Sequence, residues 1–96
     1  AYQSPSALTT ASYEGRKETV LLLLELGARI NRVEGVGNTA LKSAVSNSHG
    51  EVVQILLDKG ADVCEKTETS ALQYALEAKN QDIITMLEAA GADECN

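Results

Sequence analysis

Hydrophobic residues recur at helical spacing in one stretch of the chain, and that stretch ends at a glycine. Residues 51–63 read Glu-Val-Val-Gln-Ile-Leu-Leu-Asp-Lys-Gly-Ala-Asp-Val. Four apolar side chains share one side of a helix at this spacing: Val52, Val53, Leu56 and Leu57. Gly60 stands where helices commonly end in left-handed backbone. The pattern predicts an amphipathic helix near 50–58 that packs by one face.

The same pattern occurs twice more. Residues 18–30 read Glu-Thr-Val-Leu-Leu-Leu-Leu-Glu-Leu-Gly-Ala-Arg-Ile, and residues 82–94 read Asp-Ile-Ile-Thr-Met-Leu-Glu-Ala-Ala-Gly-Ala-Asp-Glu. The matching glycines Gly27, Gly60 and Gly91 are 33 and 31 residues apart. A fixed period sets the architecture before any local prediction. We therefore divide the chain into repeat 1 (1–33), repeat 2 (34–64) and repeat 3 (65–96), the last shortened by two residues.

Each repeat predicts a pair of helices. The expected N-caps, whose side-chain oxygens accept a hydrogen bond from the first turn, are Ser6, Thr39 and Ser70. The short helices are expected near 7–13, 40–46 and 71–78, and the longer ones near 17–25, 50–58 and 81–89. Tight turns separate them at Gly15, Ser48 and Lys79. Extended connectors at 29–38 and 62–69 lead into the next repeat, and Gly35 with Gly37 predicts a turn with unusual backbone angles.

This arrangement resembles the ankyrin repeat, which has a period of about 33 residues and a Thr-Pro-Leu-His-x-Ala signature. The signature stands here as Ser6-Ala-Leu-Thr-Thr-Ala11, Thr39-Ala-Leu-Lys-Ser-Ala44 and Ser70-Ala-Leu-Gln-Tyr-Ala75. The family's Gly-Ala-Asp-Val-Asn is matched by Gly27-Ala-Arg-Ile-Asn31, Gly60-Ala-Asp-Val-Cys64 and Gly91-Ala-Asp-Glu-Cys95. The resemblance implies an all-α fold, an ankyrin-type solenoid of three helix-turn-helix repeats joined by extended β-turn connectors.

Two signature residues of the family are missing. Alanine replaces proline at Ala7, Ala40 and Ala71, and no repeat has the histidine that ties neighbouring turns together in the family. We therefore expect modest stability. The Ser/Thr-Ala-Leu form is also loosely similar to divergent ankyrin repeats appended to multidomain NTPase-type receptors.

Composition and charge exclude several classes of partner. The 96 residues carry a net charge of −6, which argues against a nucleic-acid backbone binder. No run of apolar residues approaches the roughly 18 of a membrane helix, and the start resembles no signal peptide. The absence of an initiator Met leads us to expect a piece of a larger protein. Repeat 3 alone carries two basic and seven acidic residues, a charge of −5, which fits either a solvated end or a surface for a basic partner.

The two ends of the stack are predicted to differ in polarity. Glu88 and Glu94 replace apolar residues of the earlier repeats, so repeat 3 is expected to act as a C-terminal cap. In repeat 1, Leu21 stands where the others have Gln54 and Thr85. We hypothesise that Leu21 is covered by upstream sequence or by a second copy of the chain. The alternative is an ordinary exposed leucine.

The two cysteines, Cys64 and Cys95, occupy matching positions in adjacent repeats. Packed helices lie about 8–10 Å apart, whereas a disulfide needs Cα atoms within roughly 7 Å. This comparison predicts two unbridged cysteines that fill turn positions, with Cys95 as the better candidate for a redox-sensitive thiol. Reduced thiols and the lack of a signal peptide predict an intracellular, most simply cytoplasmic, location.

The sequence gives little support for enzyme activity or for metal binding. His49 is the only histidine, and two cysteines elsewhere in the stack do not give enough converging ligands for zinc. Gly35-Val-Gly37 is too short for a phosphate-binding loop. The acidic residues form no motif, and Glu25, Asp58 and Glu88 fall on exposed or capping faces. We expect neither enzyme activity nor a cofactor or metal.

The resemblance implies a protein or peptide partner bound on the concave side of the stack, through connector tips and the exposed ends of the short helices. Carried over by matching positions, the candidate residues are Tyr2, Gln3, Pro5, Tyr13, Glu14, Arg32, Val33, Val36, Asn38, Ser46, Asn47, Lys66, Thr67, Thr69, Glu77 and Ala78. Tyr13 is the strongest candidate because tyrosine is enriched at the energetic centres of interfaces. The alternative function is a structural spacer or self-association segment without a dedicated ligand.

Overall fold

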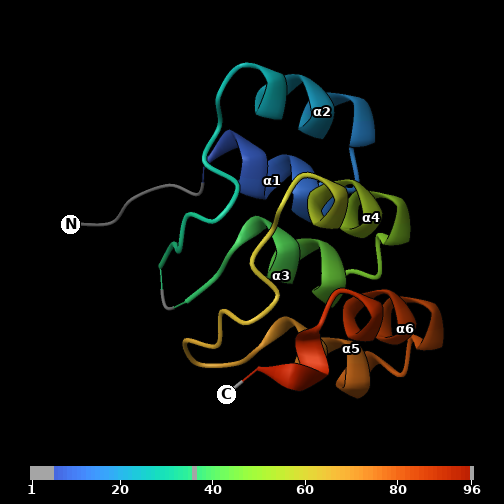
Figure 1. Cartoon of the computed structure of the whole chain (residues 1–96). Coiled ribbons are helices and arrows are strands. Elements are labelled where there is room, and N and C mark those ends of the chain that lie inside the picture. Colours follow the sequence, from blue (N-terminus) through green and yellow to red (C-terminus); the bar gives the residue numbers. More distant parts are fainter. Residues whose placement is uncertain (1–5, 36, 96) are drawn as a thin grey trace.

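The structure, a computed structural model, describes residues 6–35 and 37–95 and is all-α in those ranges. Three helix pairs follow in order: α1 (Ala7–Glu14) with α2 (Lys17–Glu25), α3 (Ala40–Ser46) with α4 (Gly50–Asp58), and α5 (Ala71–Ala78) with α6 (Gln81–Ala89). A short 3₁₀ helix, η1 (Ala92–Glu94), follows α6. The pairs are stacked one below another, and the connectors leave the stack on one side (Figure 1). The predicted helical solenoid is confirmed.

The short helices begin at the predicted caps. The side-chain oxygens of Ser6, Thr39 and Ser70 each accept a hydrogen bond from the backbone amide three residues later. The turns that end these helices use left-handed backbone, with φ of 74° at Gly15, 57° at Ser48 and 57° at Lys79. Glycine adopts this conformation without strain, whereas the other two residues do so at a cost.

The core is a continuous apolar seam between the helix pairs. Leu8 and Leu41 are buried, and Leu72 packs partly buried against the same cluster. The small residues Ala44 and Ala75 are completely buried at matching positions of α3 and α5. Small side chains at these points let the helix backbones approach closely, so successive repeats share one core rather than three.

The first connector forms the predicted tight turn. Glu34 and Asn38 make an isolated antiparallel bridge around Gly35 and Gly37, which both have positive φ. A Cβ atom at Gly37 would lie 2.6 Å from the carbonyl oxygen of Thr67 on the next connector. Glycine is needed there because the two connectors lie in contact.

A buried lysine joins the second and third repeats. Lys42 is 2% exposed, and its Nζ donates to the carbonyl oxygens of Gly37 at 2.7 Å and Thr67 at 3.0 Å. The same Nζ is 2.7 Å from Oε1 of Glu65. Lys42 occupies the fourth position of the signature, where the family has its histidine. The sequence comparison noted the missing histidine but did not identify Lys42 as its substitute.

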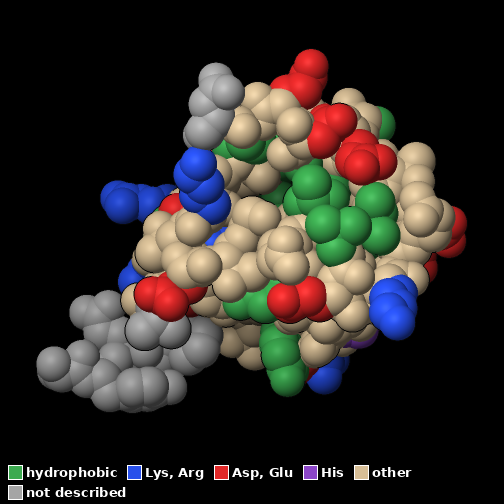
Figure 2. Space-filling model, turned by 90° about the horizontal axis from the view of Figure 1, so that it is seen from below, with side chains coloured by type: hydrophobic (Ala, Val, Ile, Leu, Met, Phe, Trp, Pro, Cys, Tyr) green, Lys and Arg blue, Asp and Glu red, His purple; other side chains and the backbone are tan. Residues whose placement is uncertain are grey.

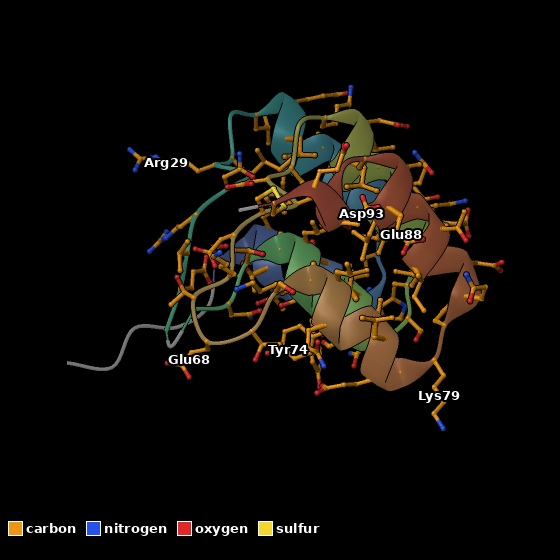
Figure 3. The ribbon with its side chains drawn as sticks, turned by 60° about the horizontal axis from the view of Figure 1, so that its bottom comes forward. Arg29, Glu68, Tyr74, Lys79, Glu88 and Asp93 are labelled. Atoms are coloured by element: carbon orange, nitrogen blue, oxygen red, sulfur yellow. A yellow bond between two sulfur atoms is a disulfide. The ribbon has the colours of Figure 1, made fainter. Side chains whose placement is uncertain are left out.

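The prediction of two unbridged cysteines is wrong. Cys64 and Cys95 form a disulfide with their Cα atoms 5.4 Å apart, and Figure 3 draws it as a yellow bond. The helix spacing used for the prediction does not apply, because the turns after the long helices stack in direct contact. At the matching position of repeat 1, Asn31 accepts from the Asp62 amide at 2.7 Å and donates to the Gly60 carbonyl at 3.4 Å.

Asn31 thus links the turns of repeats 1 and 2 by hydrogen bonds, and the disulfide links the matching turns of repeats 2 and 3. Since the described chain has no free cysteine, the argument from reduced thiols to an intracellular location loses its basis. The expected redox-sensitive thiol at Cys95 is likewise replaced by one half of a disulfide.

Candidate functional site

The candidate site is a cavity beside the exposed ring of Tyr13. It has a volume of about 320 Å³ and is lined by Thr9, Thr10, Tyr13, Asn38 and Ser43. These residues come from α1, from the end of the first connector and from α3. Tyr13 is 55% exposed. A partly exposed aromatic ring at the rim of a small cavity can pack against an apolar group while its hydroxyl stays in water.

The end of α1 that carries Tyr13 is held by the second repeat. Asn47 donates from Nδ2 to the Tyr13 carbonyl oxygen at 2.8 Å, and Nε2 of His49 lies 2.9 Å from the same oxygen. The His49 ring also packs against Gly15, where a Cβ atom would lie 2.6 Å from Nδ1. These contacts fix the backbone at Tyr13, while its side chain stays exposed.

The start of α1 is anchored by a carboxylate from the first connector, that of Glu34, which does not itself line the cavity. Oε1 of Glu34 accepts at 2.9 Å from the backbone amide of Ser6, the N-cap of α1. Burial by itself would raise the pKa of Glu34, but hydrogen bonds from Ser6 and Thr9 and the charge of Arg32 together hold it below its usual value. Glu65 lies at the matching place, five residues before the next N-cap, and its hydrogen bond from Lys42 lowers its pKa in the same way.

Two of the predicted residues of repeats 1 and 2 share the cavity, namely Tyr13 and Asn38. Asn38 donates from Nδ2 to Oγ of Ser43 at 2.8 Å. Arg32 lines a different cavity, between α1 and α2, and its Nε is 3.7 Å from Oε2 of Glu34. The structure therefore does not bring Arg32 and Tyr13 to one cavity, although both are exposed.

Of the remaining predicted residues of repeats 1 and 2, those that the structure describes do not line the cavity. Glu14 is exposed and pairs with Arg16 at 2.7 Å. Val33 is 45% exposed on the connector, and Ser46 is exposed with its Oγ donating to the Ser43 carbonyl. The predicted residues that fall outside the described ranges are Tyr2, Gln3, Pro5 and Val36.

The predicted residues of repeat 3 lie on the second connector and at the end of α5. Lys66 and Thr67 are exposed, and the Thr67 amide donates to Oε1 of Glu65 at 2.7 Å. Thr69 is half-buried. Glu77 and Ala78 are exposed at the end of α5, and Glu77 accepts from Gln73 at 3.3 Å. None of these residues lines the cavity.

Three cavity residues were missed from sequence, namely Thr9, Thr10 and Ser43. A signal was available for Thr10, because it precedes Tyr13 by three residues and therefore shares its side of α1. Ser43 could not be placed from its own helix, since it meets the cavity only through the stacking of α3 on α1.

Within residues 6–35 and 37–95, no group of three or more His, Cys, Asp or Glu side chains is arranged to hold a metal ion. In the same ranges, every helix is too short or too polar to cross a bilayer.

Comparison with known families agrees with the fold. The family model described as ankyrin repeats (3 copies) matches residues 8–96, so the chain belongs to the ankyrin-repeat family. Ankyrin repeats are in general protein–protein interaction modules rather than catalysts.

Among individual relatives, the human ankyrin repeat and KH domain-containing protein 1 is 42% identical over 71 residues, which is 74% of this chain and 3% of the relative. The Drosophila melanogaster ankyrin repeat and KH domain-containing protein mask is 37% identical over 86 residues, 85% of this chain and 2% of that protein.

A third relative, the mouse B-cell lymphoma 3 protein homolog, is 38% identical over 95 residues, 96% of this chain and 21% of the relative. The chain thus spans only a small part of each of these proteins. The similarity covers repeats within these proteins and does not extend to the activity of each whole protein.

Proposed function

We propose that this chain is a protein-binding module whose surface centres on Tyr13 and the cavity beside it. The proposal rests on one observation: Tyr13, which is 55% exposed, borders a cavity of about 320 Å³ with mostly apolar walls. Exposed aromatic residues next to pockets are the usual energetic centres of protein interfaces. The concave groove expected from the family resemblance would run from this cavity over the connectors and the end of α5.

The size of the cavity and the polar groups around it suggest what kind of ligand would bind there. The cavity has room for one apolar side chain, while Asn38 and the α1 threonines offer polar groups around it. The groups that hold the site together, such as Asn47 on the Tyr13 carbonyl, are already used within the fold. We therefore infer a peptide segment that inserts one apolar side chain beside Tyr13 and makes few charged contacts there.

The test uses a random peptide library selected against the whole chain, with the binding site then mapped by NMR on the labelled protein. The proposal expects selected peptides to shift the signals of Thr10, Tyr13 and Ser43, and Tyr13→Ala to weaken binding by roughly tenfold or more. Leu26→Ala is the matched control, because Leu26 is 74% exposed at the end of α2 and does not line the cavity.

Peptides that bind Tyr13→Ala as tightly as the original chain would show that the cavity is not the binding site. Failure of the library to yield any binder, in repeated selections, would favour the structural-spacer function instead.

A further inference from the structure

The first turns of the three long helices repeat one another in sequence and follow one another along the stack. α2, α4 and α6 lie one below another (Figure 1). The second residue of each of these helices is acidic, namely Glu18, Glu51 and Asp82. The first residue differs, since it is Lys17 in α2 and Gly50 in α4. This difference leaves the two junctions between repeats with different charge pairing.

Between repeats 1 and 2, the start of one long helix forms an ion pair with the start of the next. Nζ of Lys17, the first residue of α2, is 2.9 Å from Oε2 of Glu51, the second residue of α4. One repeat further along, the same contact would join the first residue of α4 to the second residue of α6. Those residues are Gly50 and Asp82, so the side chain that would carry the ammonium group is missing.

A cavity lies beside Gly50, where that side chain would be. It has a volume of about 490 Å³, and Gly50, Asp82 and Met86 are among the residues that line it. We call it the helix-start cavity. A Cβ atom on Gly50 would lie 3.6 Å from Cε of Met86, which is an ordinary contact distance. The buried side chains of Val52 and Ile83 also line the cavity, so it combines an apolar lining with an exposed carboxylate.

The carboxylate of Asp82 has no cationic partner within the chain that the structure describes. The ion pairs found in residues 6–35 and 37–95 join other side chains. The base nearest to Asp82 in sequence is Lys79, and Figure 3 shows its side chain projecting away from the helices. Since Asp82 is exposed, a cation from another molecule can reach it.

We propose that the helix-start cavity binds a lysine side chain of a partner protein, with the ammonium group on Asp82 and the methylene stem against Met86. The chain itself provides the template, because Lys17 makes the equivalent contact one repeat earlier. A lysine has an apolar stem and a charged end, which matches the mixed lining. The helix-start cavity shares no lining residue with the cavity beside Tyr13, so the two proposals are independent.

The surrounding charge also favours a cation. Repeat 3 carries two basic and seven acidic residues, a charge of −5. Figure 2 views the molecule from the side of α5 and α6, and it shows acidic side chains at several places on that face. Glu51 also lines the cavity, although Lys17 already pairs with it. Such a surface attracts a basic segment and repels an acidic one.

The test is an NMR titration of the whole labelled chain with two acetylated and amidated tripeptides, Gly-Lys-Gly and Gly-norleucine-Gly. Norleucine keeps the stem of lysine but lacks the ammonium group. The lysine peptide should cause saturable shifts of the amide signals of Gly50, Asp82 and Met86. The norleucine peptide should bind roughly threefold to fivefold more weakly. Asp82→Asn should weaken binding of the lysine peptide by a similar factor and leave binding of the norleucine peptide unchanged.

Three further variants control the experiment, and circular dichroism checks that each is folded. Glu18→Gln should leave binding unchanged, because Glu18 has the same place in α2 but does not line the cavity. Gly50→Ala adds only a Cβ atom in ordinary contact with Met86, and should keep most of the binding. Gly50→Lys should abolish binding, because the new side chain would fill the cavity and pair with Asp82.

Four results would overturn the proposal. Equal binding of the two tripeptides would mean that Asp82 plays no part. Equal losses in Glu18→Gln and Asp82→Asn would mean a general attraction to an acidic surface. Full binding by Gly50→Lys would mean that the lysine peptide binds elsewhere. The absence of saturable shifts up to the solubility limit of the lysine peptide would mean that the cavity binds no lysine side chain.

Discussion

At the scale of single residues, Lys42 shows how one side chain can replace a family signature. The sequence identified Lys42 only as a departure from the expected histidine. In the structure its ammonium group reaches two connectors and Glu65. Its role could not be predicted because Glu65 lies 23 residues further along the chain, and only the folding of the second connector brings it within reach.

Lys42→Met should therefore destabilise the chain strongly. Methionine fills similar space but leaves the carbonyl groups of Gly37 and Thr67 and the Glu65 carboxylate without this donor. We expect a loss of about 2–4 kcal/mol in the free energy of unfolding, measured by urea denaturation. Lys59→Met, at an exposed position, should change stability by less than about 0.5 kcal/mol. Equal losses in the two variants would show that Lys42 has no special role.

The turn residues allow a prediction of the opposite sign. Lys79 has a φ of 57°, in the region that glycine adopts freely. Lys79→Gly should stabilise the chain by about 0.5–1 kcal/mol, because it relieves this strain at an exposed turn. Gly15→Ala should do the reverse and cost more than about 1 kcal/mol, since the new Cβ would also meet the His49 ring. Thermal unfolding of both variants provides the measurement, and a lower melting temperature for Lys79→Gly would contradict the argument.

At the scale of elements, the helices were predictable and the contacts between connectors were not. The predicted short and long helices agree with the structure to within a residue at nearly every end, because apolar spacing, caps and glycines are local signals. The disulfide was wrongly excluded because the spacing of helices was applied to turns. Asn31 was the available clue, since its amide can bridge only turns that lie in direct contact.

The disulfide should stabilise repeat 3 against unfolding. It closes a loop with a sequence separation of 31 residues, for which the entropy argument gives roughly 3–4 kcal/mol. Cys64→Ser with Cys95→Ser should lower the free energy of unfolding by an amount of that order, and a reducing agent should do the same to the original chain. A reducing agent that leaves the urea midpoint of the original chain unchanged would contradict the bridge.

The connector carboxylates predict how stability depends on pH. The pKa values of Glu34 and Glu65 are lower in the folded chain than their usual value. In acid the unfolded chain binds more protons than the folded one. Their contribution is therefore complete above the unfolded pKa, near 4.3, and is lost as the pH falls through the folded pKa. Glu34→Gln with Glu65→Gln should flatten the decline of the urea midpoint below about pH 4.5, and an unchanged decline would contradict this assignment.

At the scale of the whole molecule, the period of the sequence predicted the architecture. Which residues line each cavity and which are exposed could be seen only in the structure. Spacing of leucines and glycines was enough to predict three stacked helix pairs. It could not show that Arg32 and Tyr13 line different cavities, or that Leu76 is exposed at one end of the stack. Leu21, chosen from sequence as the unusual leucine, is half-buried, whereas Leu22 and Leu26 are the more exposed neighbours.

The central claim is that the three repeats bury one shared core and so fold as one unit. Tyr13 lies in repeat 1 and Tyr74 in repeat 3, and their ring signals in NMR spectra report the two ends separately during a urea titration. If the repeats depend on one another, both signals should change to their unfolded positions at the same urea concentration, together with the loss of helical circular dichroism. Two clearly separate midpoints would mean that the end repeats unfold independently, and would contradict the shared core.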